Sequence, residues 1–355
     1  MSFDLIAGQD RAVAALRRML RSSRTPHALI FAGPPGVGKM TTALEFAKAL
    51  VCAKQADDAC GRCPHCRKAE HGTHPDIYRV EPEGDGRQIK IEVFHNRKTG
   101  EGLLKTLNLK PNEAKHKVVL IDQAEAMNGP SANCFLKTLE EPPPQSVLVL
   151  VTPRPDDLPE TIVSRCQVIR FCPLAQGIVR DALEKHGLDA ATARFLAQSS
   201  GGSLGRATEM AGETALPAVR MELLRLVTGL HEGNLIASAA RVTQIVRELA
   251  TARAEAAATP VRTESRSVAE WLLDLAVLFY RDVAVRQVGV DPDRMLNQDV
   301  ADLIDKETSI SRRGIRSILD RIEEAKGFVR ANVDIDATVL DTFSGIAACR
   351  DQRAA

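Results

Sequence analysis

Apolar and polar positions follow two different rhythms along the chain, and the first half carries short apolar runs. These runs have the length of buried strands and stand at 27–32, 77–80, 118–121 and 147–152. Stretches with helical spacing lie between them, among them 41–50 and 131–139. Because strands that alternate with helices form parallel sheets covered on both faces, the pattern predicts an α/β fold.

Past Pro173 the strand-like runs end and helical periodicity takes over. A small helical unit is expected over 177–210, where Gly201, Gly202 and Ser203 predict a turn. Further on, helical spacing recurs in four segments, at 221–230, 242–258, 268–285 and 313–329. The pattern from about residue 216 to 350 therefore predicts an all-helical final domain.

An apolar stripe at helical spacing runs through the third of these segments. It consists of Val268, Trp271, Leu272, Leu275 and Leu278. Such a stripe is more often the packing face of a helix bundle than a ligand site. We therefore expect three domains, namely an α/β domain over 1–174, a helical lid over 175–213 and a helical domain over 214–355.

A glycine-rich turn joins the first predicted strand to the helix that follows, with the sequence Gly33-Pro34-Pro35-Gly36-Val37-Gly38-Lys39. A strand before it and a helix after it are the context of a phosphate-binding loop. The three glycines let backbone N–H groups approach phosphates, and Lys39 can reach the outer ones. The loop therefore predicts a site for ATP or ADP.

One position departs from the pattern of such loops. Met40 follows the lysine, where a Ser or Thr hydroxyl normally ligates Mg²⁺. A thioether is a poor ligand for a hard cation, so Mg²⁺ binding should be impaired. Thr41 remains a candidate for the nucleotide site, but one residue further along a helix points about 100° away.

A second acidic element follows the predicted strand at 118–121. Asp122 should lie at the carboxyl end of that strand, beside the phosphate loop, where it could hold Mg²⁺ through water. Gln123 stands where a glutamate would polarise the attacking water, and an amide cannot act as that base. Glu125 could substitute for it, but its offset of two residues favours a place on the surface. Met40 and Gln123 both predict impaired hydrolysis.

Four cysteines stand close together after the first long helix, at Cys52, Cys60, Cys63 and Cys66. Thiolates at this spacing can close a tetrahedron around zinc, which predicts a structural Zn²⁺ site within an insert at about 52–75. The other four of the eight cysteines are scattered and are expected to be small buried side chains.

Composition narrows the class of protein further. The chain has 355 residues, of which 44% are hydrophobic and 26% charged, and its net charge is +1. A charge this close to zero gives no general reason for tight binding to nucleic acid. No apolar run is long enough to cross a bilayer and the first ten residues lack the layout of a secretory signal, so we expect a cytoplasmic protein with reduced cysteines.

These features together resemble the bacterial clamp-loader family of AAA+ proteins, which place a ring-shaped sliding clamp on DNA for the replicative polymerase. The resemblance covers about the first 210 residues and includes two further pieces, 133–143 (Asn-Cys-Phe-Leu-Lys-Thr-Leu-Glu-Glu-Pro-Pro) and Ser164-Arg165-Cys166. It implies an AAA+ phosphate-loop domain, a helical lid and a helical collar that joins the subunits.

The resemblance also implies roles for single residues. In this family the arginine that matches Arg165 projects into the nucleotide site of the neighbouring subunit as a finger acting in trans. Thr152 matches the first nucleotide sensor. A second sensor arginine is expected in the lid, where this chain has Gly205, with Arg206 beside it. The implied partners are gamma/tau-type ATPase subunits, a delta-type subunit, the sliding clamp and primed DNA.

Three functions remain open on the sequence. The departures at Met40 and Gln123 favour a subunit of the replicative polymerase holoenzyme that keeps the finger, hydrolyses ATP weakly or not at all, and is not itself a polymerase. An active ATPase motor subunit of the same loader would need Thr41 and Glu125 to replace the missing groups. A zinc-containing DNA-binding protein with a vestigial loop would need more basic residues than Arg62, Arg67 and Lys68 around its cysteines.

Overall fold

The computed structural model describes residues 3–22, 25–54, 57–82, 88–95, 102–212, 216–230, 232–257, 260–289 and 295–350. The chain forms two compact units, Met1–Glu209 and Met210–Ala355. The predicted boundary between lid and final domain, at 213/214, lies outside the described residues. The predicted division at 174/175 falls within the first unit and stays a prediction.

The first unit is built on a five-stranded sheet with the strand order β2-β3-β4-β1-β5. Its strands are β1 (Ala28–Ala32), β2 (Ile77–Val80), β3 (Lys117–Ile121), β4 (Ser146–Thr152) and β5 (Gln167–Arg170). All pairs are parallel. Every residue of β1, β3 and β4 is buried, as expected for inner strands with a helical layer on each face.

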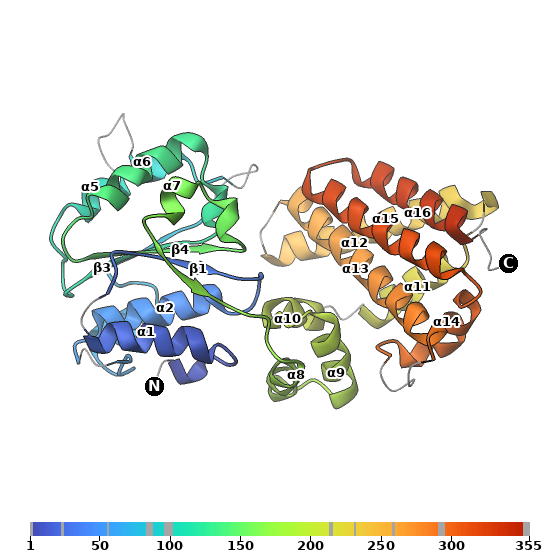
Figure 1. The fold of residues 1–355 in the computed structure, drawn as a ribbon, viewed down its shortest axis with the longest axis horizontal. Coiled ribbons are helices and arrows are strands. Elements are labelled where there is room, and N and C mark those ends of the chain that lie inside the picture. The colour runs from blue at the N-terminus through green and yellow to red at the C-terminus, as the bar shows by residue number, and fades with distance from the viewer. Residues whose placement is uncertain are drawn as a thin grey trace. The chain divides into compact units, whose positions relative to one another are not determined.

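Helices cover both faces of this sheet (Figure 1). One layer contains α1 (Asp10–Ser22), α2 (Lys39–Val51) and α3 (Pro64–Glu70), and the other contains α4 (Ile91–Phe94), α5 (Leu103–Leu107), α6 (Gly129–Glu140) and α7 (Glu160–Val163). Side chains of β1 alternate between the two faces of the sheet. Leu29 and Phe31 pack with the first layer, and Ala28 and Ile30 pack with the second.

Short 3-10 turns and three further helices complete this unit. The turns are η1 (Phe3–Leu5), η2 (Ala124–Ala126) and η3 (Pro155–Asp157), and the helices are α8 (Gln176–Lys185), α9 (Ala190–Ser199) and α10 (Leu204–Gly212), the last running past Glu209. The predicted α/β fold with a helical segment after Pro173 is confirmed. The sequence pattern does not predict strand β5. This strand has only four residues, and because Gln167 and Arg170 are exposed, it lacks an apolar run.

The second unit is all-helical, as predicted. Its elements are α11 (Leu216–Thr228), η4 (Glu232–Asn234), α12 (Leu235–Ala257), α13 (Val261–Gln287), η6 (Gln298–Val300), α14 (Ala301–Glu307), α15 (Arg312–Arg330) and α16 (Ile335–Arg350). Helix α13 packs against α11, α12, α14 and α15. Its predicted stripe is a packing face, since Val268, Trp271, Leu272 and Leu275 are buried and Leu278 is half-buried.

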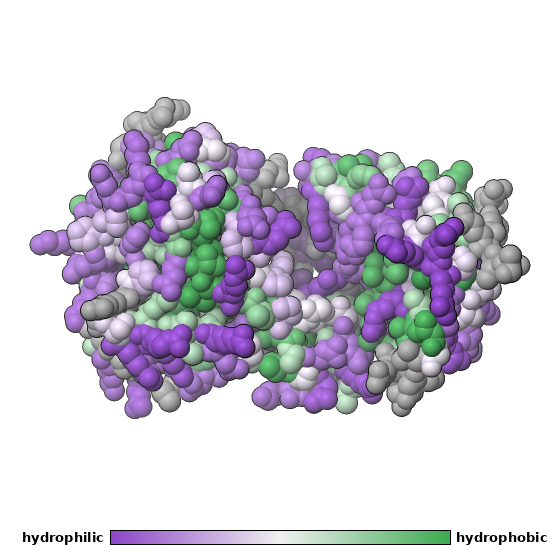
Figure 2. All heavy atoms as spheres, viewed as in Figure 1, coloured by the Kyte–Doolittle hydropathy of each residue, from purple (hydrophilic) through white to green (hydrophobic). Residues whose placement is uncertain are grey.

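The surface follows from this packing of amphipathic elements. Figure 2 shows hydrophilic residues over most of the visible face of each unit, with hydrophobic residues gathered in patches between them. Within the described residues, no helix combines the length and the apolar character needed to cross a bilayer.

Candidate nucleotide and metal sites

The phosphate loop runs from the end of β1 to the start of α2, as the sequence predicts. Gly33 lies against Phe171, the residue that follows β5, and a Cβ atom on Gly33 would stand 2.4 Å from the carbonyl oxygen of Phe171. Gly38 caps α2 with a left-handed φ of 94°. A side chain at Gly33 would collide with the neighbouring strand and one at Gly38 would be strained, so both positions require glycine.

Lys39 is folded back onto this loop. Its Nζ donates hydrogen bonds to the carbonyl oxygens of Gly33 at 2.6 Å and Pro34 at 2.7 Å. Burial lowers the pKa of Lys39, and the negative charges of Glu125 and Asp122 oppose this shift. The ammonium group thus holds the loop together from within, at the place where it would meet the outer phosphates of a nucleotide.

A cavity of about 930 Å³ opens beside the loop. Of the residues predicted for the nucleotide site, it brings together Gly36, Gly38, Lys39, Thr41, Asp122 and Thr152. Gly33 is not among its lining residues and serves the close approach to β5 instead. This volume lies within the range of small-ligand pockets, so the cavity can accommodate a nucleotide.

The two departures from an active site are visible in the same cavity. Met40 lines the wall of the cavity. The buried hydroxyl of nearby Thr42 does not replace the missing one, because it donates within the helix to the carbonyl oxygen of Gly38 at 2.8 Å. Gln123 has a left-handed φ of 48°, and its N–H donates to Asp122 Oδ1 at 3.0 Å. Asp122 therefore offers an oxygen to a cation, whereas Met40 offers only sulfur.

The expectation that Glu125 lies on the surface is wrong. Glu125 is half-buried in η2 and lines the cavity, and its Oε2 is shielded from solvent without a hydrogen-bond partner among the described residues. Burial raises the pKa of Glu125 and the charge on Asp157 adds to this, whereas a backbone hydrogen bond and the charge on Lys39 oppose it. The left-handed turn at Gln123 redirects the chain so that η2 packs beside β4.

The lid segment meets the phosphate loop at the position of the missing second sensor. The N–H of Gly205 donates to the carbonyl oxygen of Gly36 at 3.0 Å, and a Cβ atom on Gly205 would stand 3.0 Å from Gly36 Cα. Any side chain there would push α10 off the loop. Gly205 thus provides close backbone packing where the family resemblance implies an arginine.

Arg165 lies outside the lining of this cavity, just before β5. Its Nη2 donates to Glu140 Oε1 at 2.8 Å and its Nη1 to the carbonyl oxygen of Thr161 at 2.9 Å. Glu140 ends α6, in the Glu-Glu-Pro-Pro part of the recognised sequence piece. Sequence reasoning did not assign this partner, since 25 residues separate the pair and only the fold brings α6 beside α7.

The four predicted cysteines come together in space. Their Sγ atoms all lie within 4.8 Å of one another, and Cys60 and Cys66 are 3.9 Å apart. A tetrahedral Zn–S bond of about 2.3 Å implies sulfur–sulfur distances of about 3.8 Å, so the arrangement fits such an ion. Cys52 follows the end of α2 and Cys63 caps the start of α3, so two helix ends fix the group.

Backbone groups support the thiolate form in this cluster. The N–H of Cys60 donates to Cys52 Sγ and that of Cys66 to Cys63 Sγ, both at 3.4 Å. Backbone hydrogen bonds from Arg62 and Cys63 lower the pKa of Cys60 to about 6, whereas burial raises the pKa of Cys66. Cys52 and Cys66 are fully buried. Donors that point at sulfur and two fully buried ligands are typical of a structural metal site.

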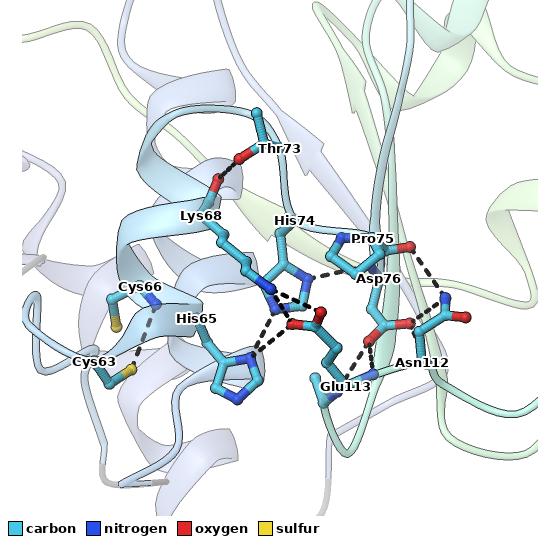
Figure 3. A network of polar contacts seen from close by, with 11 residues as sticks. Cys63, His65, Cys66, Lys68, Thr73, His74, Pro75, Asp76, Asn112 and Glu113 are labelled. Atoms are coloured by element: carbon cyan, nitrogen blue, oxygen red, sulfur yellow. Dashed lines mark hydrogen bonds and ion pairs between the residues drawn. The ribbon is translucent and has the colours of Figure 1, made fainter.

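A polar network beside the cluster fastens α3 to the sheet (Figure 3). Asp76 precedes β2 and is fully buried, and its two carboxylate oxygens accept the N–H groups of Asn112, Glu113 and Ala114 at 2.6 to 2.9 Å. Lys68 of α3 donates to both carboxylate oxygens of Glu113. The segment before β3 is therefore tied to both β2 and α3.

His65, His74 and Glu113 of this network are also close enough to hold a metal ion, but their hydrogen bonds argue otherwise. The N–H of Asp76 donates to His74 Nδ1 at 3.1 Å, so the proton of neutral His74 is on Nε2, facing His65 Nδ1 at 3.0 Å. A metal ion on Nε2 would displace this proton and leave Nδ1–H opposed to the N–H of Asp76. We interpret the group as a hydrogen-bonded fastening.

We expect Asp76→Ala to destabilise the protein by about 3 kcal/mol, because three backbone N–H groups lose a charged acceptor. Burial opposes ionisation of Asp76, but the hydrogen bonds outweigh it and hold its pKa below the ordinary value. Because the pKa of Asp76 is lower in the folded than in the unfolded state, its ionised form stabilises the fold above the unfolded-state pKa. This stabilisation is lost as the pH falls through the folded-state pKa. Urea unfolding should thus show a constant difference above about pH 4 that narrows below it. A variant as stable as wild type at pH 7 would contradict this account.

The parallel sheet with a phosphate loop, the helices α8 to α10 that follow it and the all-helical second unit agree with the architecture that the resemblance to AAA+ proteins implies. Residues 8–175 match the family described as "DNA polymerase III, delta subunit". This part of the chain is thus similar to clamp-loader subunits of DNA polymerase III, and the similarity that extends over nearly the full length is to a delta-prime subunit.

That similarity is to the DNA polymerase III subunit delta' of Bacillus subtilis, 28% identical over 92% of both chains. The subunit delta' of Pseudomonas aeruginosa is 40% identical over 42% of this chain and 43% of its own. The subunit tau of Escherichia coli is 34% identical over 52% of this chain and 27% of its own. Both shorter matches thus cover less than half of those relatives.

Proposed function

We propose that this chain is a cytoplasmic, delta-prime-type subunit of the replicative clamp loader that supplies Arg165 in trans to the nucleotide site of a neighbouring ATPase. It would assemble with gamma/tau-type ATPase subunits and a delta-type subunit, and help to place the sliding clamp on primed DNA. Its second unit would join the collar between subunits.

The position of Arg165 is the observation that carries this proposal. All strands are parallel, and the phosphate loop follows the carboxyl end of β1, whereas Arg165 precedes the amino end of β5. Gln167 pairs with Leu29, four residues before Gly33, so the start of β5 lies about 13 Å along the strands from the loop. Arg165 thus lies near the amino ends of the strands, whereas this chain's own nucleotide site lies at their carboxyl ends.

The chemistry of a guanidinium suits the proposed role. Arg165 is 37% exposed in its side chain and lies just before β5, an edge strand that pairs only with β1 among the described strands. A planar fork of N–H donors can bind two oxygens of a transferred phosphoryl group and neutralise the charge that develops there. A neighbouring subunit seated against this edge would receive the arginine.

The chain's own nucleotide site would bind ATP or ADP with little hydrolysis. Gly36, Gly38 and Lys39 would hold the phosphates, with Asp122 and Thr152 at the adjoining strand ends. The residues present fit Mg²⁺ poorly, since Asp122 is a suitable oxygen ligand but Met40 is not. The four cysteines would hold one structural Zn²⁺, whose contribution is to fix the end of α2 against α3.

The proposal is tested by clamp loading with a reconstituted loader. Complexes assembled with and without this chain are compared for the amount of sliding clamp that they place on primed DNA per unit time. We expect the complex that lacks the chain to load clamp at background level. Equal loading by both complexes would contradict the proposal.

The ion pair with Glu140 gives a smaller prediction. Glu140 neutralises Arg165 within this chain, so it competes with a phosphate of the neighbouring site for the same N–H groups. Because exposed ion pairs are weak, Glu140→Gln should raise ATP turnover of the assembled loader about two- to fivefold at low ATP. The adjacent Glu141→Gln is the control. Unchanged turnover in Glu140→Gln, or an equal rise in Glu141→Gln, would contradict the proposed competition between Glu140 and the phosphate for Arg165.

A further inference from the structure

A carboxylate that the sequence places on the surface stands inside the candidate nucleotide site. Glu125 lies in η2, which packs beside β4 after the left-handed turn at Gln123. It lines the same cavity as Lys39, Asp122 and Thr152. The carboxyl group is therefore brought to the ends of β3 and β4, on the side of the cavity where Thr152 stands.

The surroundings of Glu125 are those of a basic carboxylate. Its Oε2 is shielded from solvent and lacks a hydrogen-bond partner among the described residues. Glu125 lines the same cavity as Lys39. Because the lysine of such a loop meets the outer phosphates, a terminal phosphate would lie in the cavity that Glu125 lines.

We propose that Glu125 is the general base of this nucleotide site and takes the place of the glutamate that Gln123 lacks. The proposal rests on the proposed nucleotide binding by this loop. Glu125 accepts a proton from the attacking water while the oxygen of that water bonds to the terminal phosphorus. The bond from that phosphorus to the bridging oxygen breaks, which leaves ADP, inorganic phosphate and a protonated Glu125 that later releases its proton to solvent.

Neither neighbouring residue can take this role. The Gln123 amide has no useful proton affinity near neutral pH. Asp122 Oδ1 already accepts a hydrogen bond from the N–H of Gln123, and its other oxygen is the one that would face a cation. Burial, by contrast, raises the pKa of Glu125 toward the range in which a carboxylate is an effective base.

Hydrolysis by this chain would then be limited at Met40 alone. Mg²⁺, when bound, neutralises charge on the phosphates, and a hydroxyl at position 40 would complete its ligands. Restoring that hydroxyl should therefore make the rate of hydrolysis depend on the base that the site holds. Variants at positions 125 and 123 on this background then show which residue is that base.

The test is single-turnover hydrolysis of labelled ATP by the full chain, in excess over ATP. Met40→Thr should raise the rate about tenfold or more. Adding Glu125→Gln on that background should lower the rate about a hundredfold, while Glu184→Gln, which alters an exposed glutamate of α8 outside the lining of this cavity, should leave it unchanged. Binding of a fluorescent ATP analogue should differ by less than about threefold between Met40→Thr and Met40→Thr/Glu125→Gln.

A second readout is the pH profile of the Met40→Thr variant. Its rate should rise with pH and level off once Glu125 is ionised, and the rise should be absent with Glu125→Gln. Equal rates with and without Glu125→Gln, or a Met40→Thr variant that stays inactive until Gln123→Glu is added, would overturn the proposal. So would failure of every variant to bind the ATP analogue. None of these results touches the trans role of Arg165, which fails only in the assembled loader.

Discussion

Replacing Arg165 with alanine should lower the ATP turnover of the assembled clamp loader, measured with sliding clamp and primed DNA, by about a thousandfold or more. The expected loss is large because a finger arginine acts on charge that develops only in the transition state. Removing it therefore lowers kcat and leaves nucleotide affinity largely unchanged. The loader should still assemble, because Arg165 is 37% exposed in its side chain.

Two further variants give this prediction its controls. Arg165→Lys keeps the charge but not the planar fork of donors, so it should recover only a small part of the lost turnover. Arg180→Ala removes an arginine with a similar surface ion pair, to Asp181, and should behave as wild type. Unchanged turnover with Arg165→Ala, in a complex shown to be intact, would leave this chain as a scaffold without a finger.

Loss of the metal from the cysteine cluster should have the largest effect on stability. Cys66→Ser removes a fully buried side chain of the cluster. We expect the purified wild type to carry one zinc ion per chain and the variant to lack it. Structural zinc in small modules contributes about 10 kcal/mol or more to folding. Even with local unfolding of the module alone, the melting temperature should fall by about 10 °C or more.

Cys172→Ser is the matched control, since Cys172 is exposed and lies outside the cluster. It should keep both zinc and melting temperature. Elemental analysis and thermal unfolding with and without a chelator measure both quantities. A Cys66→Ser variant that is as stable as the wild type, or a wild-type protein that contains no metal, would contradict the structural zinc site.

The parts of the fold that sequence predicts are those with a local signal. The runs that form β1, β3 and β4 are largely apolar, so their place at the centre of the sheet follows from the sequence within a few residues. The spacing of Gly33, Gly36 and Gly38 and of the four cysteines likewise restricts local chain geometry. The amino-acid pattern by itself is therefore enough to locate the phosphate loop and the cysteine cluster.

The remaining features depend on contacts between distant segments. Strand β5 is short and has exposed ends, so it exists only because β1 offers it a partner. Glu125 reaches the cavity through a left-handed residue at Gln123, a backbone state that non-glycine residues seldom adopt and that spacing alone does not reveal. The pairing of Arg165 with Glu140 requires α6 and α7 to pack together.

The measurement that tests the central claim most directly is stimulation of a neighbouring ATPase by this chain. Purified gamma/tau-type subunit is mixed with wild-type chain or with Arg165→Ala, binding is verified for both, and single-turnover ATP hydrolysis is followed. The account predicts stimulation by about a thousandfold with wild type and almost none with Arg165→Ala. Equal stimulation by both chains would show that the arginine of this subunit does not act in trans.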